Sequence, residues 1–136
     1  MYRLSLTVIL LLSFAFFGGP KRSKDYDLKD YFDFYNRVYF HDNLPHDTIA
    51  EWGEPEDGKE YLIGLTEGTK ERHPYRIIVS RFYNPSIQES RETLLHEMCH
   101  IYTEENGDLD FNPHGEAWQE CMLNLANNYH AFEYLW

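Results

Sequence analysis

The sequence is poor in basic residues. Only 12 of its 136 residues are Lys or Arg, against 23 that are Asp or Glu, which gives a formal net charge of -11. A protein with an extensive nucleic-acid surface normally carries clustered Lys and Arg side chains, because contacts to phosphates supply much of the affinity. The basic residues here are scattered along the chain. The composition therefore argues against a broad DNA or RNA interface.

Cysteine is also scarce, and the chain is short. The two cysteines, Cys99 and Cys121, form no Cys-x-x-Cys pair and cannot build a framework of several disulfides. Both fall in segments that we predict to be helical, where a small buried thiol is the ordinary interpretation. A disulfide between them and zinc ligation by Cys99 are the weaker alternatives. With 136 residues, the chain is long enough for one hydrophobic core, so we expect a single domain.

No stretch of the sequence is as long and apolar as a membrane-spanning helix. The longest apolar or small run covers the 14 residues 4–17, which is short of the roughly 20 that a span needs and close to a signal-peptide core. No pair of small residues marks a cleavage site after it. We treat 1–19 as a hydrophobic N-terminal segment that favours export or membrane association. The alternative is a cytoplasmic protein whose true start lies later or whose leader packs on the domain.

The most informative feature that the sequence does contain is a short motif, His96-Glu97-Met98-Cys99-His100. Four residues make about one helical turn, so the imidazoles of His96 and His100 leave the same face of a helix and can bind one metal ion. Glu97 lies one residue off that face, where its carboxylate can take a proton from a water held on the metal without becoming a ligand. The pattern is typical of zinc hydrolases, with Glu97 as the catalytic residue.

The residues around the motif predict that it lies on a helix. Ser86 is followed three residues later by Glu89, which is the capping-box signature of a helix start, and Asn106-Gly107 supplies a stop. Between these signals, apolar residues recur at helical spacing. We therefore predict a helix of about five turns that begins near Ile87.

A catalytic zinc site needs a third protein ligand. The continuation of the motif lacks the glycine and histidine found in one subclass of zinc peptidases, so this ligand must come from elsewhere. His114 is the favoured candidate because it follows Asn112-Pro113, a pair suited to the start of a second helix, and precedes a glycine that leaves room for a metal. Glu116 and Glu120 remain alternative ligands. The other histidines are interpreted as surface or loop residues: His41, His46, His73 and His130.

The rest of the chain predicts the helices and strands that surround the site. An apolar stripe over Leu28 to Tyr39 indicates a first helix, and a similar stripe over Ala117 to Tyr129 indicates a last one. Three short β-branched or aromatic runs indicate strands at 48–52, 61–66 and 76–80. We expect an α+β domain with a small antiparallel sheet packed on the motif helix. The run 76–80 is our candidate for an edge strand that lines the cleft and aligns an extended peptide.

A hydrolase of this kind also needs a group that stabilises the oxyanion and carboxylates that orient the ligand histidines. The sequence offers only loosely defined candidates for both roles. For the oxyanion these are Tyr129, Tyr102 and Arg81. For the orienting carboxylates they are Asp108, Asp110 and Glu116.

Taken together, these residues resemble a known family. The run from Glu92 to His100, followed by His114-Gly115-x-x-Trp118, is similar to the SprT-like zinc metallopeptidases, which include the Spartan proteases of DNA–protein crosslink repair. The run 31–40 with Leu44-Pro45 resembles the opening helix of that family. The resemblance covers Asp27 to about Tyr129 and implies a zincin-like metallopeptidase domain over 27–136. It implies Zn2+ held by three ligands, with Glu97 as general acid/base; the ligands are His96, His100 and His114.

The resemblance implies hydrolysis of peptide bonds in a protein or peptide substrate, with DNA-bound or DNA-crosslinked proteins as the best-known targets of the family. The net charge of -11 does not support the DNA partner. The alternative function is a catalytically silent, zinc-containing interaction module on DNA or on a membrane. The presence of Glu97 favours the enzyme, because a purely structural zinc site needs only its ligands and usually fills all four positions.

Overall fold

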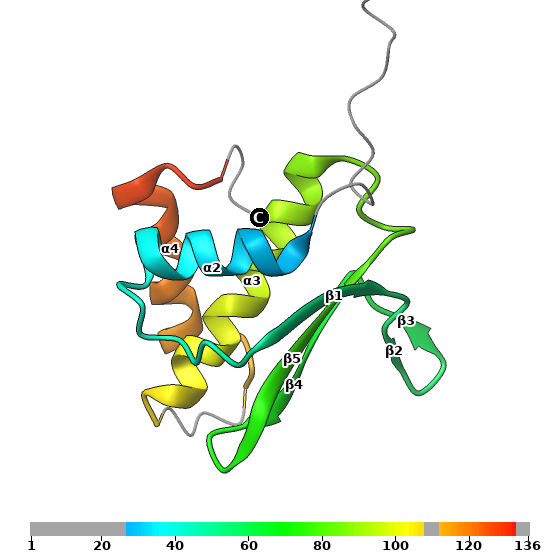
Figure 1. Ribbon diagram of the computed structural model, residues 1–136, viewed down its shortest axis with the longest axis horizontal. Coiled ribbons are helices and arrows are strands. Elements are labelled where there is room, and N and C mark those ends of the chain that lie inside the picture. Colours follow the sequence, from blue (N-terminus) through cyan, green and yellow to red (C-terminus); the bar gives the residue numbers. More distant parts are fainter. Residues whose placement is uncertain (1–26, 108–111, 133–136) are drawn as a thin grey trace, which may run out of the picture.

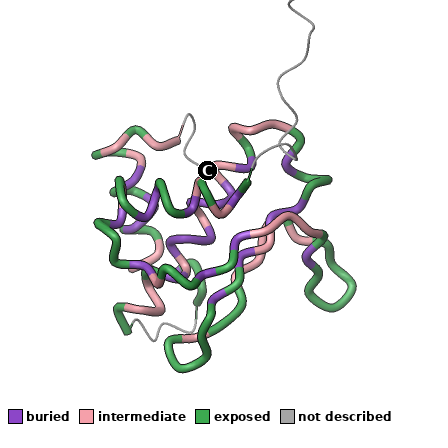
Figure 2. Tube along the Cα trace, viewed as in Figure 1, coloured by how far each residue is buried: buried purple, intermediate pink, exposed green. Residues whose placement is uncertain are grey.

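The computed structural model describes residues 27–107 and 112–132, in which three helices lie on one side of a small sheet (Figure 1). The helices are α2 (Leu28–Tyr39), α3 (Ile87–Glu105) and α4 (Glu116–Tyr129). The strands are β1 (Ile49–Gly53), β2 (Glu56–Asp57), β3 (Glu60–Tyr61), β4 (Gly64–Thr69) and β5 (Arg72–Ser80). This arrangement confirms the predicted α+β class. Buried residues concentrate where the helices meet the sheet, while the tip of the β2–β3 hairpin is exposed (Figure 2).

The hydrophobic N-terminal segment predicted at 1–19 lies outside the described residues. None of the helices within 27–107 and 112–132 is long and apolar enough to cross a membrane.

Helix α2 forms where its apolar stripe predicts it. Its N-cap, Asp27, accepts a hydrogen bond from the backbone N–H of Lys29 at 2.8 Å, which satisfies one of the free donors at a helix start. Further along, the buried amide of Asn36 donates to the carbonyl of Leu44 at 2.9 Å and accepts from the Leu44 N–H at 3.1 Å. These two bonds fix the turn that leads from α2 into the sheet.

Helix α3 also begins and ends as predicted. Ser86 is the N-cap, and its hydroxyl accepts from the Glu89 N–H while the Glu89 carboxylate accepts from the Ser86 N–H, which completes the capping box. Asn106 is the C-cap. The apolar side chains around the histidine pair are fully buried against the core; they are Leu94, Leu95, Met98 and Ile101. The motif therefore lies on a helix that is held firmly at its start and along its inner face.

The sheet is mixed, which corrects the antiparallel sheet predicted from the sequence. Its strand order is β1-β5-β4, with β5 parallel to β1 and antiparallel to β4. The inner face of β5 carries Tyr75, Ile77 and Val79, all buried. Alternation of apolar residues shows which face of a strand is buried but not which strands are neighbours, and this is why the parallel pair was not predicted.

The edge strand was also assigned wrongly. Because β5 lies at the centre of the sheet, the run 76–80 cannot be the edge that lines the cleft. Arg76 instead forms ion pairs across the sheet with Glu51 of β1 and Glu67 of β4. The edge nearest α3 is β4, whose Thr66 contacts Glu97 on that helix. The predicted strand at 61–66 is divided between β3 and β4.

A disulfide joins Cys99 on α3 to Cys121 on α4, where the sequence analysis favoured two buried thiols. Both residues are buried, and their Cα atoms lie 5.9 Å apart. That distance depends on how α3 and α4 pack, which residue spacing does not show. The bond ties the motif helix to the helix that carries Trp118.

Reduction of this disulfide is expected to lower the free energy of unfolding by about 3 kcal/mol, because the bond closes a loop with a sequence separation of 22 residues and restricts the unfolded chain. Urea unfolding followed by circular dichroism, with and without reductant, measures the change. A variant with both Cys99→Ala and Cys121→Ala is the control, since its midpoint should not respond to reductant. A wild-type midpoint that is equally insensitive would mean that the bond does not form.

Candidate metal centre

Three histidine rings converge between α3 and the start of α4. His96 and His100 leave the same face of α3, and His114 approaches from the loop before α4. The ring centroids lie 5.1 Å (His96 to His100), 5.0 Å (His96 to His114) and 4.9 Å (His100 to His114) apart. One nitrogen from each ring lies within 4.8 Å of the other two. The structure thus brings together the three residues that the sequence analysis selected as ligands.

The spacing and chemistry of these nitrogens suit a zinc ion. His96 Nε2 lies 3.1 Å from His114 Nε2, close to the roughly 3.3 Å between two ligands of a tetrahedral zinc with bonds of about 2.0–2.1 Å. An imidazole binds metal only when neutral. Burial, together with the neighbouring histidines, lowers the pKa of His96 to about 3 and that of His100 to about 4. Both rings therefore offer a lone pair at neutral pH.

The loop before α4 presents His114 to the cluster. The side-chain oxygen of Asn112 accepts from the His114 N–H at 3.0 Å, and the Asn112 carbonyl accepts from the Gly115 N–H at 3.0 Å. Helix α4 begins only at Glu116, with Gly115 as its N-cap, so the predicted helix start at Asn112-Pro113 was too early. The side chain of Asn112 builds a turn before the helix instead of capping it, since α4 begins four residues later, at Glu116.

Trp118 packs against all three rings. Its centroid lies 4.7 Å from that of His96, 5.7 Å from that of His100 and 4.6 Å from that of His114. Its indole N–H donates to the carbonyl of His96 at 3.3 Å, which joins the first turn of α4 to α3. The ring of His100 also bonds to the backbone of Pro113, whose only polar group is its carbonyl. Contacts of this kind fix the orientation of ligand rings.

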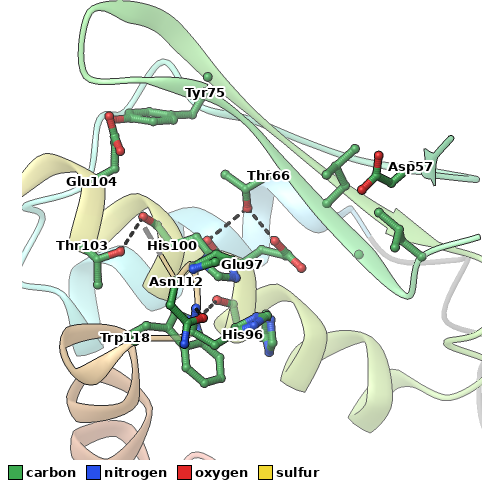
Figure 3. A pocket seen from close by; sticks show the side chains of 17 residues that line it. Asp57, Thr66, Tyr75, His96, Glu97, His100, Thr103, Glu104, Asn112 and Trp118 are labelled. Atoms are coloured by element: carbon green, nitrogen blue, oxygen red, sulfur yellow. Dashed lines mark hydrogen bonds between the residues drawn. The ribbon is translucent and has the colours of Figure 1, made fainter. Parts of the chain in front are cut away.

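Glu97 lies beside the cluster and is not part of it. Its side chain is only 5% exposed, and its Oε2 accepts a hydrogen bond from Thr66 Oγ1 at 2.6 Å. Figure 3 shows Thr66 of β4 directed at Glu97 across the cleft. Burial raises the pKa of Glu97 to about 7, while the Thr66 hydrogen bond acts in the opposite direction. A carboxyl group with a pKa near 7 can both accept and return a proton at neutral pH.

Gly64 makes room for this carboxylate. A Cβ at Gly64 would lie 2.8 Å from Glu97 Oε1 and 2.7 Å from Thr93 Cγ2. Thr93 cannot turn away freely, because its hydroxyl donates to Asn84 Oδ1 at 2.6 Å. The sequence analysis missed both Gly64 and Thr66. A glycine inside a predicted strand marks a close approach, and that signal could have identified Gly64.

A Gly64→Ala substitution is expected to displace the Glu97 carboxylate and to lower any hydrolysis that depends on Glu97 by roughly 100-fold, since a misplacement of about 1 Å can cost that much. It should also cost about 1–3 kcal/mol of stability through overpacking. Gly53→Ala is the matched control. Gly53 lies on β1, at the other edge of the sheet, and its Cβ would meet the Cγ2 atom of Ile78 on β5 at 2.7 Å. Urea midpoints should show similar destabilisation in both variants, and rates of peptide hydrolysis should fall only in Gly64→Ala. Equal activity losses would contradict this role.

The cluster opens into a cleft of about 510 Å³ between α3 and β4 (Figure 3). Among the described residues, its lining contains three acidic side chains and no Lys or Arg; the acidic residues are Asp57, Glu97 and Glu104. Tyr75 of β5 also lines the cleft, and its hydroxyl bonds to Glu105 at 2.8 Å. The cleft is therefore acidic in the part of the chain that the structure describes.

The candidates for oxyanion stabilisation do not line this cleft. Tyr129 packs on Tyr39 at a centroid distance of 5.1 Å, and its hydroxyl lies 3.4 Å from His41 Nε2. Tyr102 packs on Phe40. It follows His100 by two residues, which places it on the opposite side of the helix from that ligand. Arg81 follows β5 and stays outside the cleft as well.

Glu116 and Glu120, the alternative third ligands, are both exposed and lie outside the histidine cluster. Of the carboxylates considered for orienting the ligand rings, Glu116 does not line the cleft, and Asp108 and Asp110 lie outside the described residues. The remaining histidines also lie outside the cluster: His41, His46, His73 and His130.

Comparison with known proteins identifies the family of the chain. No curated protein matches the chain in sequence. The sequence model of the SprT-like family matches residues 28–134, which include every described helix and strand, the three clustered histidines and Glu97. The match covers well over half of the chain, so the protein belongs to the SprT-like family.

Proposed function

We propose that the protein is a zincin-like, zinc-dependent metallopeptidase that hydrolyses peptide bonds in the cleft between α3 and β4. The observation that carries the proposal is Glu97, a buried carboxyl group held by Thr66 beside the histidine cluster. A site that only holds a metal needs ligands and gains nothing from such a group. A hydrolytic site requires a base at this place.

In this proposal, His96, His100 and His114 hold the zinc ion and leave one coordination position for water or substrate. When bound, zinc lowers the pKa of water and polarises the carbonyl group of the substrate. Glu97 takes the proton from the attacking water and then passes it to the nitrogen of the leaving amine. Thr66 occupies Glu97 Oε2, so Oε1 is the oxygen available for proton transfer.

Strand β4 supplies the surface on which a peptide can align. It is the edge strand of the three-stranded sheet, and its residues Gly64 to Thr66 line the cleft. An extended peptide can add to such an edge through backbone hydrogen bonds. This assigns to β4 the role that the sequence analysis gave to 76–80.

The charge of the cleft does not favour a nucleic acid in it. Its described lining carries Asp57, Glu97 and Glu104 without a Lys or Arg, so it offers no basic side chain to a phosphate group. Action on DNA-bound or DNA-crosslinked proteins stays a proposal taken from the family resemblance. If it occurs, the DNA contact must use another surface.

The test is cleavage of an unfolded protein by the zinc-loaded chain, with and without single-stranded DNA. We expect fragments to accumulate, to stop accumulating when a chelator removes the metal, and to return when zinc is added back. Stimulation by DNA would support the hypothesis of action on DNA-crosslinked proteins, despite the acidic net charge of the chain. A chain that holds zinc stoichiometrically and cleaves nothing would instead support the silent interaction module.

A further inference from the structure

A second hollow opens beside the cleft, next to Glu97. It has a volume of about 330 Å³, at the small end of the range for ligand pockets and suited to one side chain. Four residues line both this hollow and the main cleft, so the two are continuous; they are Leu62, Gly64, His96 and Glu97. The hollow therefore opens directly beside the histidine cluster.

The walls that belong to the hollow alone are apolar. Tyr61 is 64% exposed and Ile63 is 53% exposed, so two large apolar side chains stand in water beside the candidate active site. Thr93 contributes its methyl group, because its hydroxyl is turned to Asn84 and its Cγ2 faces Gly64. A hollow with such walls gains free energy by burying an apolar side chain.

The direction of β4 indicates which part of a peptide reaches the hollow. The strand starts at Gly64, next to Thr93 and Glu97, and ends near Glu104, whose carboxylate accepts from the Lys70 N–H at 3.1 Å. A peptide that pairs with β4 in the more stable antiparallel sense runs the opposite way. Its C-terminal part therefore passes toward Gly64 and the hollow.

We propose that this hollow is a specificity pocket for the peptide residue that directly follows the scissile bond, and that it takes an apolar side chain such as leucine or phenylalanine. The inference rests on the proposed peptidase function and deepens it by naming the substrate class. The protein cleaves unfolded chains on the N-terminal side of apolar residues.

The test uses the full zinc-loaded chain and two peptides that differ only in leucine or serine after the bond to be cut. We expect kcat/KM to be about 10- to 100-fold higher for the leucine peptide, as for other apolar pockets. Mass spectrometry of an unfolded protein after digestion should show apolar residues at the new N-termini.

Ile63→Ser should reduce the leucine preference at least about fivefold, because it removes one wall of the pocket. The backbone there is held by the bonds from Ser80 N–H at 2.9 Å and Asn84 Nδ2 at 3.0 Å to the carbonyl of Ile63, which the substitution leaves in place. Tyr61→Ser is a second variant with the same expectation. Phe82→Ser is the matched control, since Phe82 is 75% exposed and lines neither hollow.

Calorimetric binding of both peptides to the zinc-loaded Glu97→Gln variant separates the pocket from the chemistry. Tighter binding of the leucine peptide than of the serine peptide supports the pocket. If the wild type binds in this way but cleaves neither peptide, the pocket stands and the peptidase function is overturned. Cleavage without an apolar preference overturns the pocket and leaves the peptidase intact. An undiminished leucine preference in both Ile63→Ser and Tyr61→Ser overturns the pocket as well.

Discussion

A His114→Ala variant is expected to bind zinc at least about 100-fold more weakly than the wild-type protein and to lose peptidase activity at stoichiometric zinc. His114 supplies one of the three clustered nitrogens, and its removal leaves only the two from α3. Replacing a group that merely orients a ligand already costs about 10- to 100-fold in metal affinity, so we expect the loss of a ligand to lower the affinity more. Competition with a chromogenic zinc chelator measures the affinity.

Glu116→Ala and Glu120→Ala are the matched controls for this experiment. Both glutamates follow His114 closely in sequence, both are exposed, and both lie outside the cluster. Each variant should keep the wild-type zinc affinity. Because His114 is itself exposed, its truncation leaves no buried cavity, and the urea midpoint of the metal-free variant should stay close to that of the wild type. Zinc loss in a glutamate variant, with retention in His114→Ala, would assign the third ligand differently.

The features that the sequence predicted well are local ones. The capping box between Ser86 and Glu89 fixes where α3 begins, and both partners lie within one turn of each other. The helical period then puts His96 and His100 on one face without any knowledge of the rest of the fold. His114 could be selected from its own neighbours, Asn112-Pro113 before it and Gly115 after it. These predictions required only short-range geometry.

The features that the sequence did not reveal all depend on how separate elements meet. Thr66 reaches Glu97 only because β4, and not β5, is the strand at the edge beside α3. The disulfide between Cys99 and Cys121 likewise depends on the packing of α3 against α4. In both pairs the partners lie 22 or more positions apart in sequence. Spacing along the chain therefore carries no signal for such contacts.

The glycine at position 64 shows how the two kinds of information combine. Its place in a short apolar run predicts a strand, and the absence of a side chain leaves its purpose open. Only the approach of Glu97 and Thr93 from α3 explains why a Cβ is excluded there. Gly64, Thr93 and Glu97 also line the apolar hollow beside the cleft, so the same packing contact borders both the proposed base and the pocket next to it.

A Glu97→Gln variant is expected to lower kcat by about 100- to 10,000-fold, the range for loss of a general acid/base, with little change in KM. Glutamine has nearly the same shape as glutamate, and its amide oxygen can still accept the hydrogen bond that Thr66 now donates to Oε2. It cannot take a proton from water. Because Glu97 is not part of the histidine cluster, zinc affinity should remain at the wild-type value. Steady-state peptide hydrolysis and chelator competition on the same preparation measure the two quantities.

Glu92→Gln makes the same chemical change on α3, at a residue that lines neither the cleft nor the apolar hollow, and should leave both quantities unaltered. The informative outcome is a separation between turnover and metal binding. If Glu97→Gln loses turnover and keeps zinc, the carboxylate acts on the proton and not on the metal. If it loses both together, Glu97 supports the cluster structurally. If it loses neither, another group supplies the base, and the burial of a carboxyl group whose pKa is raised to about 7 would need a different explanation.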